Sequence, residues 1–156
     1  MLYRLYKPGD FAQLYAIEEL CFEPPFRFSR AYLRQLVHSE FSATWIGEQD
    51  GRIAGFAVVE WAQDATAPEA YIQTIEVAPE HRRQGIGNKL LRRIESSAQI
   101  AGAGSIWLHV DSENEQAIRL YEAHGYRREG REEHYYARSR AALIYRKPLE
   151  NLSTAA

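Results

Sequence analysis

The chain has 156 residues, 46% of them hydrophobic and 26% charged, and its formal net charge at pH 7 is −2. These values are typical of one globular domain, so we expect a single domain over residues 1–149 and a flexible tail over residues 150–156. The balanced charge gives no reason to expect nucleic acid or a membrane as a partner, and a single cysteine excludes an internal disulfide, so a cytoplasmic protein is expected.

The N-terminal part of the chain predicts a strand followed by a helix. Residues 2–6 form the strand, and Asp10 is a suitable N-cap for the helix. Apolar residues recur at helical spacing as far as Leu20 and Cys21, so Cys21 is expected in the core. The prolines in residues 23–26 then break the helix and make an irregular aromatic loop.

Ser29 is the expected N-cap of a second helix, and a β-hairpin follows it. Strands over residues 43–49 and 52–61 flank Asp50-Gly51, which is a strong signal for a two-residue turn. Residues 64–69 are expected to form a loop.

Residues 70–104 predict a strand, a tight turn and a long amphipathic helix. The turn is basic and contains two glycines: Arg82, Arg83, Gln84, Gly85, Ile86 and Gly87. Glycines let backbone approach a ligand closely, and the first N–H groups of a helix are unpaired and lie at the positive end of its dipole. The arginines add mobile positive charge. The stretch is therefore predicted to bind an anion.

Two familiar phosphate-binding loops do not fit this turn. A Walker A loop requires Lys and then Ser or Thr directly after its last glycine, where this chain has Asn88 and Lys89. The dinucleotide fingerprint requires a third glycine, and Leu90 occupies that place.

The C-terminal part of the chain predicts three strands and one helix. Residues 105–110 alternate in the manner of a strand, a helix ending at Gly125 follows, and residues 126–131 and 141–147 form the last two strands, joined by a polar, tyrosine-rich loop. The order of elements indicates an α/β (α+β) protein with a mixed, mostly antiparallel sheet of about seven strands and helices on both faces.

Arg82-x-x-Gly85-x-Gly87, placed between a strand and a helix, resembles the coenzyme A pyrophosphate loop of the GNAT family of N-acetyltransferases. A second match to that family lies further along the chain: Asn114, Ala117, Leu120-Tyr121 and Gly125-Tyr126. The order of elements matches as well, so the resemblance covers nearly the whole chain. It implies the GNAT fold and acetyl-CoA as the cosubstrate.

The resemblance also implies which residues contact the cosubstrate. They are Ile75, Val77, Arg82, Arg83, Gln84, Gly85, Ile86, Gly87, Asn88, Asn114, Ala117 and Tyr121. In this reading a backbone N–H of Val77 stabilises the oxyanion and Asn114 hydrogen-bonds the coenzyme. Tyr121 lies by the thioester sulfur, where its phenol protonates the leaving thiolate.

The catalytic base is the point on which subfamilies differ. Bacterial enzymes that acetylate the N-terminal alanine of a ribosomal protein carry a glutamate where this chain has His109, whereas Leu108-His109-Val110 resembles the eukaryotic and archaeal N-terminal acetyltransferases. In those enzymes a tyrosine from the central strand acts with the histidine, and Tyr71 matches it. The expected base is therefore His109, with Tyr71 positioning a water, and Glu76 is the competing base.

The expected acceptor-binding residues are aromatic. Tyr135 and Tyr136 resemble the paired tyrosines with which N-terminal acetyltransferases hold a peptide backbone, and Pro25 and Phe26 occupy the place of a Phe-Pro segment in the same enzymes.

The sequence thus predicts an acetyl-CoA-dependent N-acetyltransferase that acts on the N-terminal α-amino group of a protein or peptide. A small-molecule amine or a protein lysine as acceptor remains open, and so does a catalytically silent acyl-CoA-binding sensor. The histidines show no metal-ligand spacing, so no metal site is expected, and a monomer and a homodimer are both compatible with the sequence.

Overall fold

The computed structural model describes residues 1–62, 68–137 and 139–150. One seven-stranded sheet carries the fold, in the order β1-β2-β3-β4-β5-β7-β6. Its strands are β1 (Leu2–Leu5), β2 (Ser42–Gln49), β3 (Arg52–Trp61), β4 (Glu69–Val77), β5 (Ser105–Asp111), β6 (Arg127–Ala137) and β7 (Arg140–Pro148). All neighbouring pairs are antiparallel except β4 and β5, so the expected mixed, mostly antiparallel sheet is confirmed.

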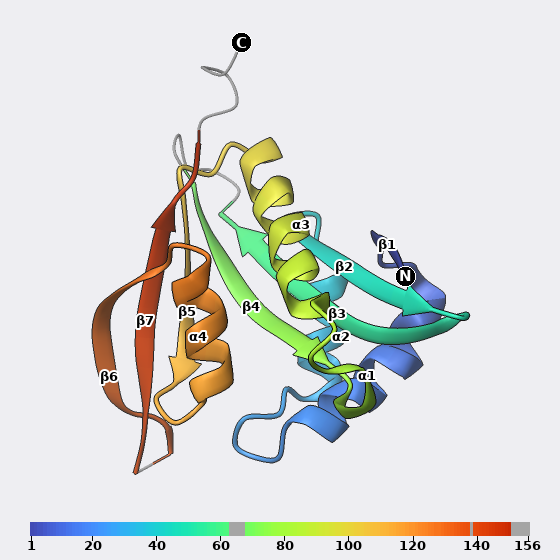
Figure 1. The fold of residues 1–156 in the computed structure, drawn as a ribbon, viewed down its shortest axis with the longest axis horizontal. Coiled ribbons are helices and arrows are strands. Elements are labelled where there is room, and N and C mark those ends of the chain that lie inside the picture. Colours follow the sequence, from blue (N-terminus) through green and yellow to red (C-terminus); the bar gives the residue numbers. More distant parts are fainter. Residues whose placement is uncertain (63–67, 138, 151–156) are drawn as a thin grey trace.

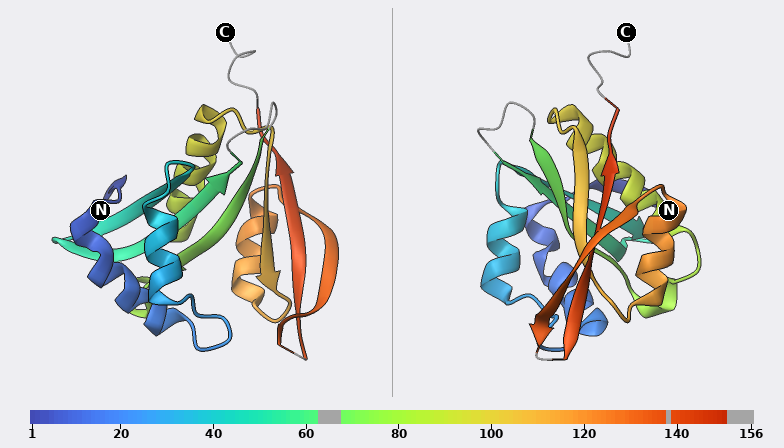
Figure 2. Two further views of the ribbon diagram at one scale, coloured as in Figure 1. Left: turned by 180° about the vertical axis from the view of Figure 1, so that it is seen from behind. Right: turned by 90° about the vertical axis from the view of Figure 1, so that its left-hand side faces the viewer.

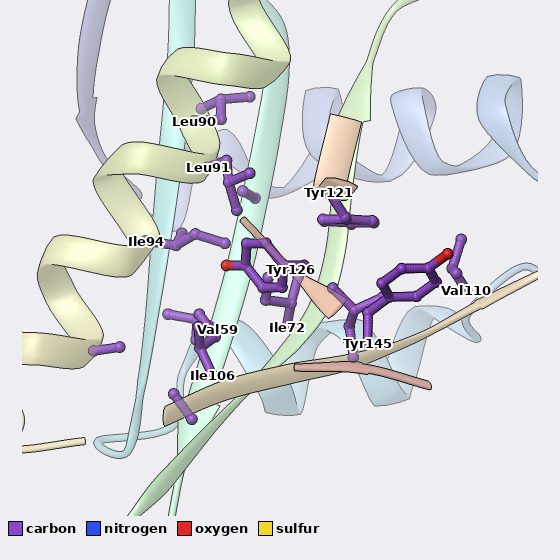
Figure 3. Packing of buried hydrophobic residues seen from close by; sticks show 14 of the residues in the cluster. Val59, Ile72, Leu90, Leu91, Ile94, Ile106, Val110, Tyr121, Tyr126 and Tyr145 are labelled. Carbon is purple, nitrogen blue, oxygen red and sulfur yellow. The ribbon is translucent and has the colours of Figure 1, made fainter. Parts of the chain in front are cut away.

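Helices cover both faces of the sheet. Helices α3 (Ile86–Ile100) and α4 (Glu115–Ala123) lie on the face toward the viewer in Figure 1, and α1 (Phe11–Cys21) and α2 (Arg30–Val37) lie on the other face, as Figure 2 shows from behind. Two hydrophobic clusters correspond to these faces. In the first cluster, Leu90, Leu91 and Ile94 of α3 pack toward the sheet, with Tyr121 of α4 nearby (Figure 3). Among the described residues, no helix is both long and apolar enough to cross a membrane.

The sheet opens between its two parallel strands. β4 and β5 pair over only three positions, the last of which is Tyr71 with Trp107, and then diverge (Figure 1). The remaining part of β4 is left without a partner strand on that side, while its other edge stays paired with β3. The divergence creates a gap at the carboxyl end of β4, and the next segment of chain is the glycine turn.

A bulge changes which face the β4 side chains occupy. Val59 pairs with Ile72 and Val58 pairs with Thr74, so Gln73 is an extra residue in the ladder. Ile72 and Ile75 consequently both pack with the α3 cluster. Thr74 and Glu76 lie on the opposite face of β4 and point toward α1 and α2.

Three sequence predictions need correction. Tyr135 and Tyr136 lie within β6, not in a loop, because β6 is an edge strand whose exposed polar residues hide the two-residue period. Leu20 is 64% exposed and lies outside the core, whereas Cys21 is half-buried and packs against the edge of the second cluster. The predicted loop at residues 64–69 gives way to β4 from Glu69, and its residues 64–67, like residues 151–156 of the expected tail, lie outside the described residues.

Candidate active site

Two adjoining cavities occupy the gap where β4 and β5 diverge. The larger has a volume of about 720 Å³ and lies on the side of the α1–α2 loop, and the smaller, of about 390 Å³, lies at the glycine turn. Both are lined by Phe22, Ile75, Asn114, Ala117 and Tyr121. A molecule bound along the smaller cavity would therefore present one end to the larger cavity beside Tyr121.

The smaller cavity ends at the start of α3. Gly85 has a left-handed conformation, with φ of 77°, and a Cβ at this position would meet open space, so the backbone is accessible to a ligand. The first α3 amide that donates within the helix is that of Lys89, to the Gly85 carbonyl at 3.2 Å. The N–H groups of residues 86–88 precede it and have no intrahelical acceptor, so they are available to donate hydrogen bonds to an anion.

Arg82 has a different role from the mobile charge that the sequence suggested. Its Nε donates to the Val77 carbonyl at 3.0 Å, and its guanidinium contacts the Cys21 sulfur at 3.5 Å. Arg82 thus ties the turn to the end of β4 and to α1. Arg83 lines the cavity with an exposed side chain, and in the part of the chain that the structure describes its guanidinium makes no ion pair. Burial raises the pKa of the Cys21 thiol, which argues against Cys21 as a nucleophile.

Asn114 and Tyr121 lie on α4 at the junction of the two cavities. Asn114 is the N-cap of α4, and its Oδ1 accepts a hydrogen bond from the Ala117 amide at 3.2 Å. Among the described residues, the side-chain NH₂ group of Asn114 has no hydrogen-bond partner, and Asn114 lines both cavities. Tyr121 is buried, with its ring edge-on to Tyr126 at 5.5 Å between centroids (Figure 3). Burial raises the pKa of Tyr121, so this phenol keeps its proton and is suited to donate it.

His109 lies on the wall of the larger cavity between two hydrogen-bonding groups. Its Nδ1 is 2.8 Å from the Tyr71 hydroxyl, and its Nε2 is 3.1 Å from Oε1 of Glu132. The Tyr135 ring stacks on the imidazole, with centroids 4.3 Å apart and planes inclined by 12°. Burial raises the pKa of Tyr71, and the neighbouring Tyr135 adds to the effect. The imidazole is therefore enclosed by phenols and oriented at both nitrogens.

Glu76 is poorly suited to act as the base. It is 2% exposed, and its Oε2 accepts a hydrogen bond from the Thr74 hydroxyl at 2.8 Å. Burial raises the pKa of Glu76 well above its ordinary value, and the neighbouring carboxyl of Glu18 adds to the effect. Glu76 lines the smaller cavity and not the larger one that contains His109, so the geometry favours His109 as the base.

Aromatic side chains from two separate parts of the chain meet across the larger cavity. Phe26 of the α1–α2 loop lies 4.9 Å from Tyr136 of β6 between ring centroids, and Tyr135 meets Tyr136 edge-on at 4.9 Å. Two side chains of α1 fix the α1–α2 loop at Phe28. Glu18 accepts a hydrogen bond from the Phe28 amide at 2.9 Å, and Tyr15 donates one to the Phe28 carbonyl at 2.9 Å.

The predicted site residues therefore fall into two groups. The expected acceptor-side residues all line the larger cavity: Pro25, Phe26, Tyr71, His109, Tyr135 and Tyr136. The expected cosubstrate residues line the smaller cavity, with the exception of Gln84, which is exposed outside it, and Glu76 also lines the smaller cavity. In the described part of the chain, no group of three or more metal-ligating side chains is present.

Sequence reasoning missed three glutamates: Glu18 below the α1–α2 loop, Glu60 on the wall of the larger cavity and Glu132 beside His109. The burial of Glu18 could have been predicted, because the helical spacing of α1 places this charged residue on the inward face of the helix. Glu60 and Glu132 carried none, because their positions depend on how distant strands pair.

A comparison with protein families matches residues 11–126 to the acetyltransferase (GNAT) family. The match covers most of the chain, and the chain belongs to the GNAT family. The glycine turn and the pattern from Asn114 to Tyr126 predicted this family, and the prediction is confirmed.

Individual relatives agree with this assignment. Streptothricin acetyltransferase of Streptomyces lavendulae is 44% identical over 80 residues, which cover 49% of this chain and 40% of that protein. The ribosomal protein bS18-alanine N-acetyltransferase of Escherichia coli (strain K12) is 34% identical over 88 residues, which cover 56% of this chain and 57% of that protein. The matches therefore span about half the length of these curated relatives.

A solved structure resembles the whole fold. The crystal structure of the ribosomal-protein-S18-alanine N-acetyltransferase from Escherichia coli superposes with a TM-score of 0.83 at 26% identity, covering 96% of this chain and 94% of that one. The expected GNAT fold is thus confirmed over nearly the full length of the chain.

Proposed function

We propose that this protein is an acetyl-CoA-dependent N-acetyltransferase and that its acceptor is the N-terminal α-amino group of a protein or peptide. The observation that carries the proposal is the meeting of the two cavities at Tyr121, with the Tyr71–His109 pair in the larger one. One cavity has an anion-binding end suited to a pyrophosphate, and the other has an aromatic wall with a candidate base.

The side chains have separate roles in this proposal. The amides that begin α3, together with Arg83, hold the pyrophosphate of the cosubstrate, and the NH₂ group of Asn114 hydrogen-bonds its pantetheine arm. Tyr121 donates its proton to the departing thiolate, which is a poor leaving group without it. The backbone amide of Val77, in the part of β4 that has no partner strand on the β5 side, polarises the thioester carbonyl.

The acceptor enters as an ammonium group and must lose a proton before it attacks. Tyr71 accepts that proton, directly or through a water, while passing its own hydroxyl proton to Nδ1 of His109. An ordinary imidazole is less basic than an α-amino group by about 1.5 pKa units and less basic than lysine by about 4 units, so the transfer suits an α-amine better. Phe26, Tyr135 and Tyr136 hold the peptide next to the amine.

The relatives support the acceptor class without deciding it. One of them is named for an alanine of the ribosomal protein bS18, and another is named for streptothricin. A small cationic amine is therefore the second candidate. Glu60 favours it, because this carboxylate lines the larger cavity and offers a charge partner for an ammonium group.

A panel of acceptors tests the proposal. Coenzyme A release from acetyl-CoA is measured with peptides that have a free N-terminus, with N-terminally blocked peptides that contain lysine, and with polyamines and amino acids. We expect kcat/KM to be highest for the free N-terminal peptides. Acetylation of the small amines alone would replace the acceptor class, and binding of acetyl-CoA without turnover of any acceptor would favour the acyl-CoA-binding sensor.

A further inference from the structure

Glu132 is the group that accepts from the outer nitrogen of His109. Its Oε1 lies 3.1 Å from Nε2, while the Tyr71 hydroxyl lies 2.8 Å from Nδ1. The His109 side chain is only 9% exposed, whereas that of Glu132 is 48% exposed. The three groups form a chain that starts at the wall of the larger cavity and ends at solvent.

The sheet brings Glu132 to His109 although β7 lies between their strands. His109 pairs with Ile144, and Glu132 pairs with Ala142 two residues away on β7. Directly paired residues and alternate residues along a strand share a face, so His109 and Glu132 project from the same face of the sheet. Ala142 has a short side chain, which leaves room for the Glu132 side chain to reach across β7.

The carboxylate determines which nitrogen of His109 carries the proton. A carboxylate only accepts hydrogen bonds, so Nε2 must hold the N–H that faces Glu132. Nδ1 is then the nitrogen with a lone pair, and it accepts the proton of the Tyr71 hydroxyl. The opposite tautomer would place a lone pair against a carboxylate and an N–H against the phenol.

We propose that Glu132 is a positioning residue for proton removal: it holds His109 in the tautomer with Nε2–H and stabilises the imidazolium that forms when Nδ1 takes a proton. The proposal rests on the function proposed above. The ammonium group gives its first proton to Tyr71, Tyr71 gives one to Nδ1, and the positive imidazolium is paired with Glu132 until solvent removes the proton. The second proton leaves the nitrogen after attack and replaces the one that Tyr121 donates to the thiolate, so both protons of the amine are accounted for.

The other side chains that pack against His109 do not provide a charge to stabilise the imidazolium. Tyr71 from β4 and Tyr135 from β6 contribute phenol rings, and Trp107 from the same strand as His109 has no ionisable group. The ionic groups nearest to Glu132 along β6, Arg131 and Glu133, are paired with each other. The charge that faces the imidazole in the described part of the chain is therefore the carboxylate of Glu132.

The test compares three variants by the pH dependence of kcat/KM with an N-terminal peptide. Glu132→Gln keeps an acceptor oxygen but removes the charge, Glu132→Ala removes both, and Glu133→Gln makes the same charge change one residue away. For Glu132→Gln we expect the midpoint of the acidic limb to move to lower pH by about 0.5 unit, the scale of a half-exposed ion pair, and kcat to fall on the order of twofold. Glu133→Gln should leave both unchanged.

Two further readouts separate positioning from a general effect on the fold. The shift of the acidic limb in Glu132→Gln should become smaller at about 1 M salt, where charges are screened over roughly 3 Å. Nitrogen NMR of the imidazole should show Nε2–H in the wild type and in Glu132→Gln, and a mixture of tautomers in Glu132→Ala. This readout does not depend on activity.

Two outcomes would overturn the inference. One is an acidic limb that stays in place in both Glu132 variants while the wild type acetylates the peptide. The other is an imidazole with its proton on Nδ1 in the wild-type protein. Absence of transfer to any α-amine by the wild type would instead overturn the proposed function, so the two failures are distinguishable.

Discussion

Substitution of Glu76 by Gln should remove a pH-dependent loss of stability. Glu76 of β4 and Glu18 of α1 are almost fully buried, at 2% and 0% exposure. Each has one oxygen hydrogen-bonded, to Thr74 and to the Phe28 amide respectively. The other oxygen of each carboxyl has no hydrogen-bond partner in the part of the chain that the structure describes. Two such neighbours cannot both ionise without a large cost.

The sign of the effect follows from the raised pKa of Glu76. Above its ordinary value of 4.5, the unfolded chain has lost this proton, while the folded protein retains it. The folded state then binds more protons, so the free energy of unfolding falls as pH rises, by about 1.4 kcal/mol per pH unit for one proton. The fall begins near the ordinary value and stops at the raised value, above which the loss is constant.

Urea unfolding at a series of pH values measures this slope directly. The Glu76→Gln protein has no proton to lose at residue 76, so its stability should exceed that of the wild type by an amount that grows by about 1.4 kcal/mol per pH unit inside the window. Glu19→Gln, an exposed change on the same helix as Glu18, is the matched control and should follow the wild type. Parallel stability curves for the wild type and Glu76→Gln would refute the reasoning.

Three more substitutions test the candidate active site and the strands and helix that support it. Tyr121→Phe should leave the Kd for acetyl-CoA unchanged and lower kcat by about 100-fold, because only the proton donor is lost; calorimetry and steady-state kinetics measure the two, and an unchanged kcat would exclude the role. Asn114→Ala should lower stability by about 1 kcal/mol through loss of the cap on the Ala117 amide, whereas Asn114→Asp should keep the cap yet weaken acetyl-CoA binding, so equal stability of the two variants would contradict the capping role. Gly55→Ala should destabilise by about 2 kcal/mol in urea unfolding, since its Cβ would lie 2.6 Å from the Glu76 carbonyl oxygen, and a wild-type midpoint would show that β3 and β4 can move apart.

Local patterns predicted the elements well where one face of an element is buried. The two-residue turn at Asp50-Gly51 has positive φ at both positions, 52° and 76°, as its residue types indicated. The alternation in β5 correctly placed Trp107 and His109 on the same face. These features depend on neighbouring residues alone, so the sequence contains the information.

Contacts between distant strands could not be read from such patterns. Glu132 meets His109 only because β7 inserts between β5 and β6 in a particular register. The bulge at Gln73 likewise depends on how β3 pairs with β4, and it decides that Glu76 faces Glu18. The extension of β6 through Tyr135 was hidden for the same reason, since an exposed edge strand shows no apolar alternation.

One competition experiment tests the central claim most directly. A peptide with a free N-terminal alanine and one internal lysine is incubated with acetyl-CoA and the protein, and tandem mass spectrometry locates the acetyl group. We predict acetyl on the α-nitrogen, with the rate reduced in His109→Ala. Acetyl on the lysine side chain, or no transfer to the peptide while a small amine is acetylated, would contradict the account.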